Sequence, residues 1–111
     1  MKRRKYGPTY DLEYAKQLIA DKKAFLTSRA RASLTNHGYT NVQQLISGVF
    51  NVMCPEDFYK SDELEKRPGI FADIYKGVWY NNEEWYVKFF IADDGNEHVE
   101  LWSFKPDGSM Y

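Results

Sequence analysis

Residues that bind metals or form cross-links are scarce in this sequence. It has one cysteine and two histidines among 111 residues, so no internal disulfide can form and a zinc site built from these residue types is not expected. The longest apolar runs are a few residues, so no transmembrane helix is expected. The basic residues 2–5 are not followed by an apolar segment and do not resemble a secretory signal. These absences favour a cytoplasmic protein with no cofactor and no membrane contact.

Net charge is also nearly absent, because 15 Lys and Arg face 16 Asp and Glu, a formal charge of −1. That value alone argues against a general nucleic-acid-binding protein. The charges are, however, unevenly distributed. Residues 1–36 hold nine basic and three acidic residues, a net +6, whereas residues 37–111 hold six and thirteen, a net −7. A basic N-terminal third can therefore bind phosphate although the whole chain is close to neutral.

Apolar and aromatic residues are plentiful, at 43% and 17% of the chain. This composition is enough for a hydrophobic core and excludes a chain that is disordered throughout. The length is typical of one domain. We expect a single domain over residues 1–111, in which residues 1–9 form a flexible basic tail.

The first half is predicted to be helical. Asp11 is a candidate N-cap for a helix over residues 12–20, and a short strand is expected at 24–26. Ser28 is a candidate N-cap for a second helix, which ends at 37–38. A third helix is predicted by apolar residues at the i, i+3, i+4, i+7, i+8 spacing, namely Val42, Leu45, Ile46, Val49 and Phe50.

The second half is predicted to form strands, because the apolar period changes to two. Apolar and polar residues alternate over 85–91 and again over 99–104, with a tight turn at 93–96. The preceding strand is expected at 70–79, and 56–61 is a weaker candidate. Helices followed by strands predict an α+β fold.

Several residues that often carry chemistry have ordinary explanations here. There is no phosphate-binding glycine-rich loop and no G-x-S-x-G motif. His37 and His98 lie at a predicted helix end and beside a turn, where structural roles are expected. Cys54 is expected to be a small packed residue. The acidic run at 62–65 is expected to be a solvated loop, because Lys and Arg follow it at once.

Three segments place a lysine beside aromatic residues on predicted strands. They are residues 57–61, 85–88 and 102–105. A structural explanation is available, since lysines protect strand edges and tyrosines fill half-buried sheet faces. By alternation, Tyr86 and Lys88 share one strand face, opposite the apolar residues of that strand.

These segments resemble those of a known family, the MqsR-type toxins, which are mRNA interferases of bacterial toxin–antitoxin pairs. Residues 56–61 resemble the family's D-F-Y-K-S segment. Residues 69–75 resemble the family's I-W-Q-D-V-Y segment, residues 85–88 its V-Y-L-K strand and residues 103–105 its S-F-K segment. Upstream, residues 26–29 resemble its short strand and T-x-R helix start. The order of the matches agrees with that of the family. The resemblance covers most of residues 10–106. It implies a RelE-like fold, with a helical N-terminal half packed on a mostly antiparallel sheet.

The resemblance also implies which residues act. The family's catalytic lysine falls on Lys60, its tyrosine on Tyr86 and its second lysine on Lys105. A glutamine of the family's site falls on Ala72, which has no hydrogen-bonding side chain. This departure leaves two hypotheses open, a cleaving toxin and a diverged homologue that binds RNA or its antitoxin without efficient cleavage.

The residue types suit metal-free RNA cleavage. Such cleavage uses the substrate's own 2′-hydroxyl as nucleophile and needs a base, positive charge at the phosphate and an acid for the leaving oxygen. Lys88, Arg29 and Ser103 are the expected RNA-binding residues. The expected partners are single-stranded mRNA and a cognate antitoxin, a DNA-binding protein encoded nearby.

Overall fold

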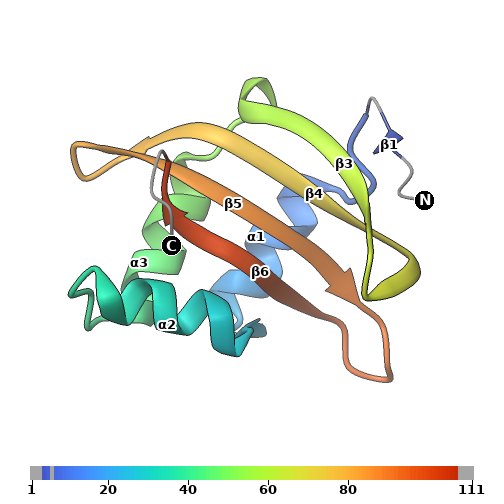
Figure 1. Cartoon of the computed structure of the whole chain (residues 1–111), viewed down its shortest axis with the longest axis horizontal. Coiled ribbons are helices and arrows are strands. Elements are labelled where there is room, and N and C mark those ends of the chain that lie inside the picture. Colours follow the sequence, from blue (N-terminus) through green and yellow to red (C-terminus); the bar gives the residue numbers. More distant parts are fainter. Residues whose placement is uncertain (1–3, 6, 108–111) are drawn as a thin grey trace.

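The computed structural model describes residues 4–5 and 7–107, and Figure 1 shows a curved sheet with helices along one side and at one edge. The helices are α1 (Leu12–Ala20), α2 (Ser28–Asn36), α3 (Val42–Val52) and the short 3₁₀ helix η1 (Pro55–Asp57). The strands are β1 (Arg4–Lys5), β2 (Ala24–Leu26), β3 (Phe58–Leu64), β4 (Arg67–Tyr80), β5 (Glu83–Ala92) and β6 (His98–Pro106). The predicted α+β class, with helices in the N-terminal half, is confirmed.

The helix starts follow from short polar side chains. Asp11 caps α1 as predicted, because its carboxylate accepts a hydrogen bond from the amide of Glu13 at 3.1 Å. The predicted cap Ser28 is wrong: Thr27 caps α2, and its hydroxyl accepts from the amide of Ala30 at 3.2 Å. Thr27 has the extended backbone of a cap, whereas Ser28 is already the first helical residue.

The described strands form one sheet in the order β1-β3-β4-β5-β6-β2. Every neighbouring pair is antiparallel except β2 and β6, which run parallel. Asn81 and Asn82 both have positive φ, 57° and 64°, which asparagine tolerates in the tight turn between β4 and β5. The strand candidate at 56–61 is only partly right, because η1 occupies its first two residues and β3 continues to Leu64.

The segment expected to be a free tail is in part joined to the sheet. Arg4 and Lys5 pair with β3, and the amides of Thr9 and Tyr10 donate to the carboxylate of Asp73 at 3.0 and 2.9 Å. Asp73 has no exposed surface, and burial raises the pKa of its carboxyl although these amides oppose the shift. Arg4, Lys5 and Thr9 of the expected tail therefore have backbone hydrogen bonds or pairing to the sheet, and residues 1–3 and 6 of it lie outside the described part.

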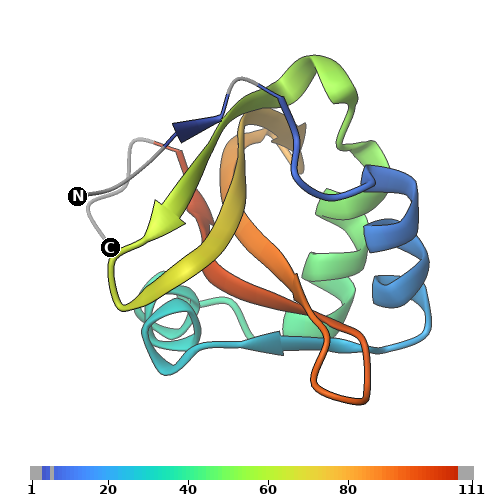
Figure 2. The same ribbon diagram turned by 90° about the vertical axis from the view of Figure 1, so that its right-hand side faces the viewer.

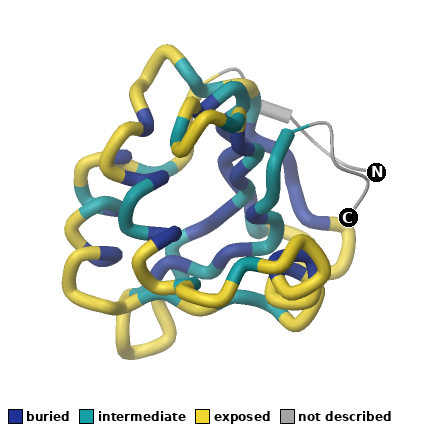
Figure 3. Tube along the Cα trace, turned by 90° about the vertical axis from the view of Figure 1, so that its left-hand side faces the viewer, coloured by how far each residue is buried: buried dark blue, intermediate teal, exposed yellow. Residues whose placement is uncertain are grey.

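The main core lies between the sheet and the helices α1 and α3. Trp85, Val87 and Phe89 of β5 have no exposed surface and pack into this core, which confirms the predicted alternation. Figure 2 shows both helices on one side of the sheet, and in Figure 3 the buried residues follow the central strands and the inner sides of the helices. Among the described residues, no helix is long and apolar enough to cross a membrane.

Candidate active site on the open sheet face

The face of the sheet opposite the main core carries a row of side chains across four strands, of which three are polar and one, Ile74, is apolar. Lys60 of β3 lies directly opposite Ile74 of β4, and Ile74 lies opposite Lys88 of β5. Lys88 in turn faces Ser103 of β6. Directly opposed residues share a sheet face, and neighbouring strands lie about 4.8 Å apart, so the row spans roughly 14 Å.

A second pair lies beside this row, nearer the end of β6. Tyr86 is directly opposite Lys105, whose Nζ lies 5.7 Å from the centre of the tyrosine ring. Burial raises the pKa of the Tyr86 phenol, and the negative charge of Asp62 raises it further. Tyr86 therefore keeps its proton at neutral pH and can donate it. The five sheet residues predicted to act or bind RNA thus share one face.

A groove lies between this face and the start of α2, with a volume of about 590 Å³. Ser103 lines it together with six charged residues, four of them basic (Arg29, Lys66, Lys88 and Lys105) and two acidic (Glu63 and Glu65). Figure 2 shows why distant segments meet here, because the turn between β3 and β4 approaches α2 across the open side of the sheet. Four of the residues predicted to act or to bind RNA therefore line the groove, namely Arg29, Lys88, Ser103 and Lys105. Lys60 and Tyr86 lie on the same sheet face but are not part of its lining.

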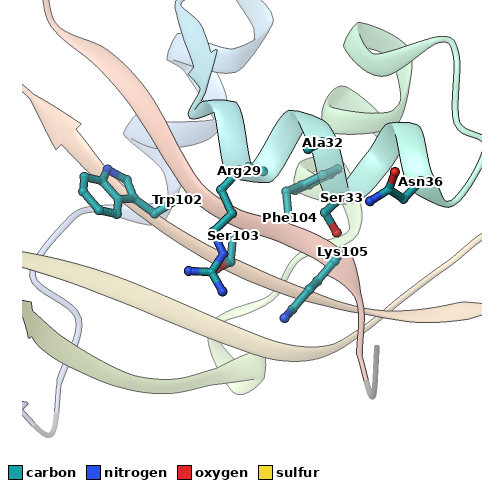
Figure 4. Close-up of a pocket in the computed structure, with 9 residues that line it drawn as sticks. Arg29, Ala32, Ser33, Asn36, Trp102, Ser103, Phe104 and Lys105 are labelled. Atoms are coloured by element: carbon teal, nitrogen blue, oxygen red, sulfur yellow. The ribbon is translucent and has the colours of Figure 1, made fainter. Parts of the chain in front are cut away.

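A smaller pocket of about 130 Å³ continues the groove between α2 and β6. Its α2 side contains the small residues Ala32 and Ser33, which leave space beside the strand. In Figure 4 the Ser33 hydroxyl points from α2 toward Lys105, and Asn36 lies at the far end. Ser33 is only 7% exposed, and its hydroxyl has no hydrogen-bond partner among the described residues. A water molecule or a ligand that enters the pocket can bond to this hydroxyl.

A model of the family described as "Motility quorum-sensing regulator, toxin of MqsA" matches residues 7–106, nearly the whole chain. The chain belongs to this family. It is therefore a toxin of a toxin–antitoxin system, with an antitoxin as partner. No curated protein sequence matches the chain.

Ala72, the position at which the resemblance implied a glutamine, is fully buried on the open face. It packs with Leu64 and Phe90 in a small apolar cluster, against which Trp102 also lies. Arg67 lies over the rings of both Phe90 and Trp102, with its guanidinium carbon 5.9 and 5.8 Å from their centres. The open face of this toxin therefore has an apolar half beside its basic half.

The expectation that the acidic run is a solvated loop holds for Glu65, which is exposed in the turn between β3 and β4, but is wrong for Asp62 and Glu63. Asp62 and Glu63 lie within β3 and are only 6% and 8% exposed. Glu63 accepts a hydrogen bond from the amide of Gly69 at 2.7 Å, which ties β3 to β4, and the carboxylate of Asp62 lies 3.0 Å from the Lys60 ammonium. Since β3 continues past Ser61, alternation places Lys60 and Asp62 on one face, a signal that could have identified Asp62 as a site residue.

The remaining candidates have structural positions. His37 caps the end of α2 and its Nδ1 lies 2.8 Å from the Ser33 carbonyl oxygen, while Nδ1 of His98 lies 2.9 Å from the carbonyl of Asn96, as expected. The packed position expected for Cys54 is wrong, because it lies exposed in the turn between α3 and η1. Within the described part of the toxin, no group of three or more His, Cys, Asp and Glu residues could hold a metal ion.

Proposed function

We propose that this toxin is a metal-independent endoribonuclease that cleaves single-stranded mRNA through attack of a ribose 2′-hydroxyl. The observation that carries the proposal is the position of Lys60, Tyr86, Lys88 and Lys105 on one open sheet face, in a chain of a toxin family. This arrangement supplies positive charge for the phosphate and a proton donor for the leaving oxygen, without a metal ion.

The lysines and Tyr86 have different roles in the proposed reaction. In the proposed reaction the 2′-hydroxyl gives its proton to a base, the 2′-oxygen bonds to the phosphorus, and the bond from phosphorus to the 5′-oxygen breaks. The products are a 2′,3′-cyclic phosphate and a 5′-hydroxyl. Lysine ammonium groups stabilise the negative charge that develops on the phosphate oxygens. Tyr86, which keeps its proton at neutral pH, serves as a donor to the leaving oxygen.

The groove would hold the RNA backbone beside this site. Arg29, Lys88 and Lys105 would neutralise phosphates, and the Ser103 hydroxyl would donate to one of their oxygens. Single-stranded RNA is recognised through unstacked bases that lie on aromatic rings and bond through their edges. Trp102, half-buried at the groove, offers such a ring, and the pocket of Ser33 and Asn36 offers polar groups for a base edge.

Purified protein and a single-stranded RNA test the proposal. The wild type should cleave the RNA equally well with and without EDTA. The double variant Lys60→Ala with Tyr86→Ala should lose cleavage, whereas Lys16→Ala, on α1 and paired with Glu13, should keep it. No cleavage by the wild type, or unchanged cleavage by the double variant, would contradict the proposal.

The buried Ala72 favours a second candidate function, binding of RNA or antitoxin without efficient cleavage. Induced expression separates the two. Growth arrest that disappears in Lys105→Ala supports the nuclease, and harmless overexpression supports the binder. We further propose that the protein acts in the cytoplasm, and that its antitoxin is a DNA-binding protein encoded nearby.

A further inference from the structure

The pocket between α2 and β6 has the size of one aromatic ring. Its volume is about 130 Å³, and a cavity of about 150 Å³ inside a protein holds a benzene molecule. A six-membered ring therefore fits into this pocket, whereas the fused rings of a purine need more room. The walls suit the flat faces of such a ring, because Ala30 and Ala32 line the pocket from α2 and Phe104 lines it from β6.

The polar groups of the pocket suit the edge of a pyrimidine base. The Ser33 hydroxyl and the Asn36 amide each offer a donor and an acceptor, and the Lys105 ammonium offers donors alone. Uracil and cytosine both have a carbonyl oxygen beside a ring nitrogen, which such groups can pair with. In the described part of the chain no acidic side chain lines the pocket, whereas Glu63 and Glu65 line the neighbouring groove.

The state of the Ser33 side chain points to a ligand rather than to a structural role. A serine inside a helix usually faces solvent or bonds to the carbonyl four residues earlier. Ser33 is 7% exposed and its hydroxyl has no partner among the described residues. Alanine is also the better helix former, so the fold alone does not call for a serine here. In Figure 4 the hydroxyl points toward Lys105, whose flexible side chain can turn aside for a ligand.

The pocket adjoins the groups proposed to cleave the RNA. Lys105 lines both the pocket and the groove, and its Nζ lies 5.7 Å from the centre of the Tyr86 ring. Arg29, Trp102 and Ser103 also line both. A nucleotide whose base enters the pocket therefore has its sugar and phosphate directed to the groove and to Lys105. The base in the pocket then determines which phosphodiester of the RNA lies at the site.

We propose that this pocket binds one pyrimidine base of single-stranded RNA and so sets the position of cleavage, with Ser33 as a specificity-determining residue. This inference rests on the proposed ribonuclease function, because it takes RNA as the ligand. The apolar walls contact the faces of the ring, and the Ser33 hydroxyl and the Asn36 amide bond to its edge. A purine at this position leaves part of its ring system outside the pocket and is cleaved more slowly.

Cleavage of a single-stranded RNA of mixed sequence, with the product ends identified by sequencing, tests the proposal. The wild type should cut next to pyrimidines, at one fixed position relative to the selected base. Ser33→Ala should lower the ratio of cleavage at pyrimidine sites to cleavage at purine sites by about 5-fold or more. Its unfolding midpoint should equal or exceed that of the wild type, since alanine suits the helix.

A second variant fills the pocket from an exposed helix position. Ala32→Leu adds a larger side chain that α2 tolerates well, and it should lower the same ratio by about 10-fold or more. The matched controls are Ala20→Leu, at the exposed end of α1, and Ser47→Ala, on α3, which line neither the pocket nor the groove. Both should keep the wild-type selectivity. Ala32→Leu also decides the question if Ser33→Ala does not fold.

Binding of mononucleotides, followed by NMR, examines the pocket without cleavage. Uridine 3′-monophosphate should shift the amide signals of Ser33 and Asn36 more than adenosine 3′-monophosphate does, and inorganic phosphate should leave them in place. Equal shifts with both nucleotides, or selection of a purine in the cleavage assay, would overturn the proposal. So would unchanged selectivity in either folded variant, the result expected of a pocket that holds only water. A wild type that cleaves no RNA contradicts the ribonuclease function, and the NMR titration then still decides whether the pocket binds a pyrimidine.

Discussion

The two faces of the sheet have opposite compositions, although the same strands build both. On β5, Trp85, Val87 and Phe89 point to the helices and have no exposed surface. Tyr86 and Lys88, which alternate with them, are half-buried on the open face. A shift of one residue in pairing would exchange the two sets. The packing of the covered face therefore fixes the position of every polar side chain on the open face.

The two faces should differ most in how much a substitution lowers the free energy of unfolding, and two adjacent residues of β5 test this. Phe89 packs against the rings of Phe50 and Tyr75, with centres 5.5 and 6.0 Å away. Phe89→Ala should lower the free energy of unfolding by about 3–5 kcal/mol, because it leaves a cavity in the main core. Lys88→Ala should change that free energy by only about 0.5 kcal/mol but weaken RNA binding. Urea unfolding and RNA titration of both variants measure this contrast, and equal losses of stability would contradict it.

The variant Tyr86→Phe tests whether Tyr86 contributes to cleavage rather than to stability. It removes a hydroxyl but keeps the ring under Lys105, so the unfolding midpoint should stay close to that of the wild type. The cleavage rate should fall by about 10²- to 10⁴-fold, the usual contribution of a proton-transfer group. Because the pKa of Tyr86 is raised above its ordinary value near 10, the wild-type rate should not decline between pH 7 and pH 9. A decline in that interval would show that Tyr86 is not the proton donor.

The covered face could be predicted from the sequence because it depends on periodicity. The alternation in β5 and the helical spacing of α3 both give the buried residues that the structure has. Positions on the open face were predictable where alternation or a family motif applied, as for Lys60, Tyr86 and Lys105. The ion pair of Asp62 was missed because charge density alone predicts a solvated loop, whereas pairing with β1 and β4 buries this part of β3. The groove depends on the tertiary arrangement that places α2 and the turn between β3 and β4 on its opposite walls, and no local pattern contains that arrangement.

A smaller effect is expected where α2 begins, at the boundary between the two faces. Thr27→Ala removes the hydroxyl that accepts from the amide of Ala30 and should destabilise the protein by about 1 kcal/mol. Ser28→Ala is the matched control and should have little effect, because that hydroxyl is not the cap. Thermal unfolding of the two variants measures the difference. If Ser28→Ala were the more destabilising variant, the assignment of the cap to Thr27 would be wrong.

The smallest expected effect is on RNA affinity, and it tests whether the RNA-binding surface includes α2. Arg29 is exposed and lines the groove with Lys88 and Lys105. If its guanidinium neutralises one RNA phosphate, Arg29→Ala should weaken binding a few-fold and reduce the slope of log affinity against log salt by about 0.7. Arg31→Ala, on the same helix but outside the groove lining, should leave the slope unchanged. Binding measured at several salt concentrations, with a variant that cannot cleave, separates these outcomes. Equal slopes for both variants would confine the RNA-binding surface to the strands, so that α2 would be a wall of the groove without contact to phosphate.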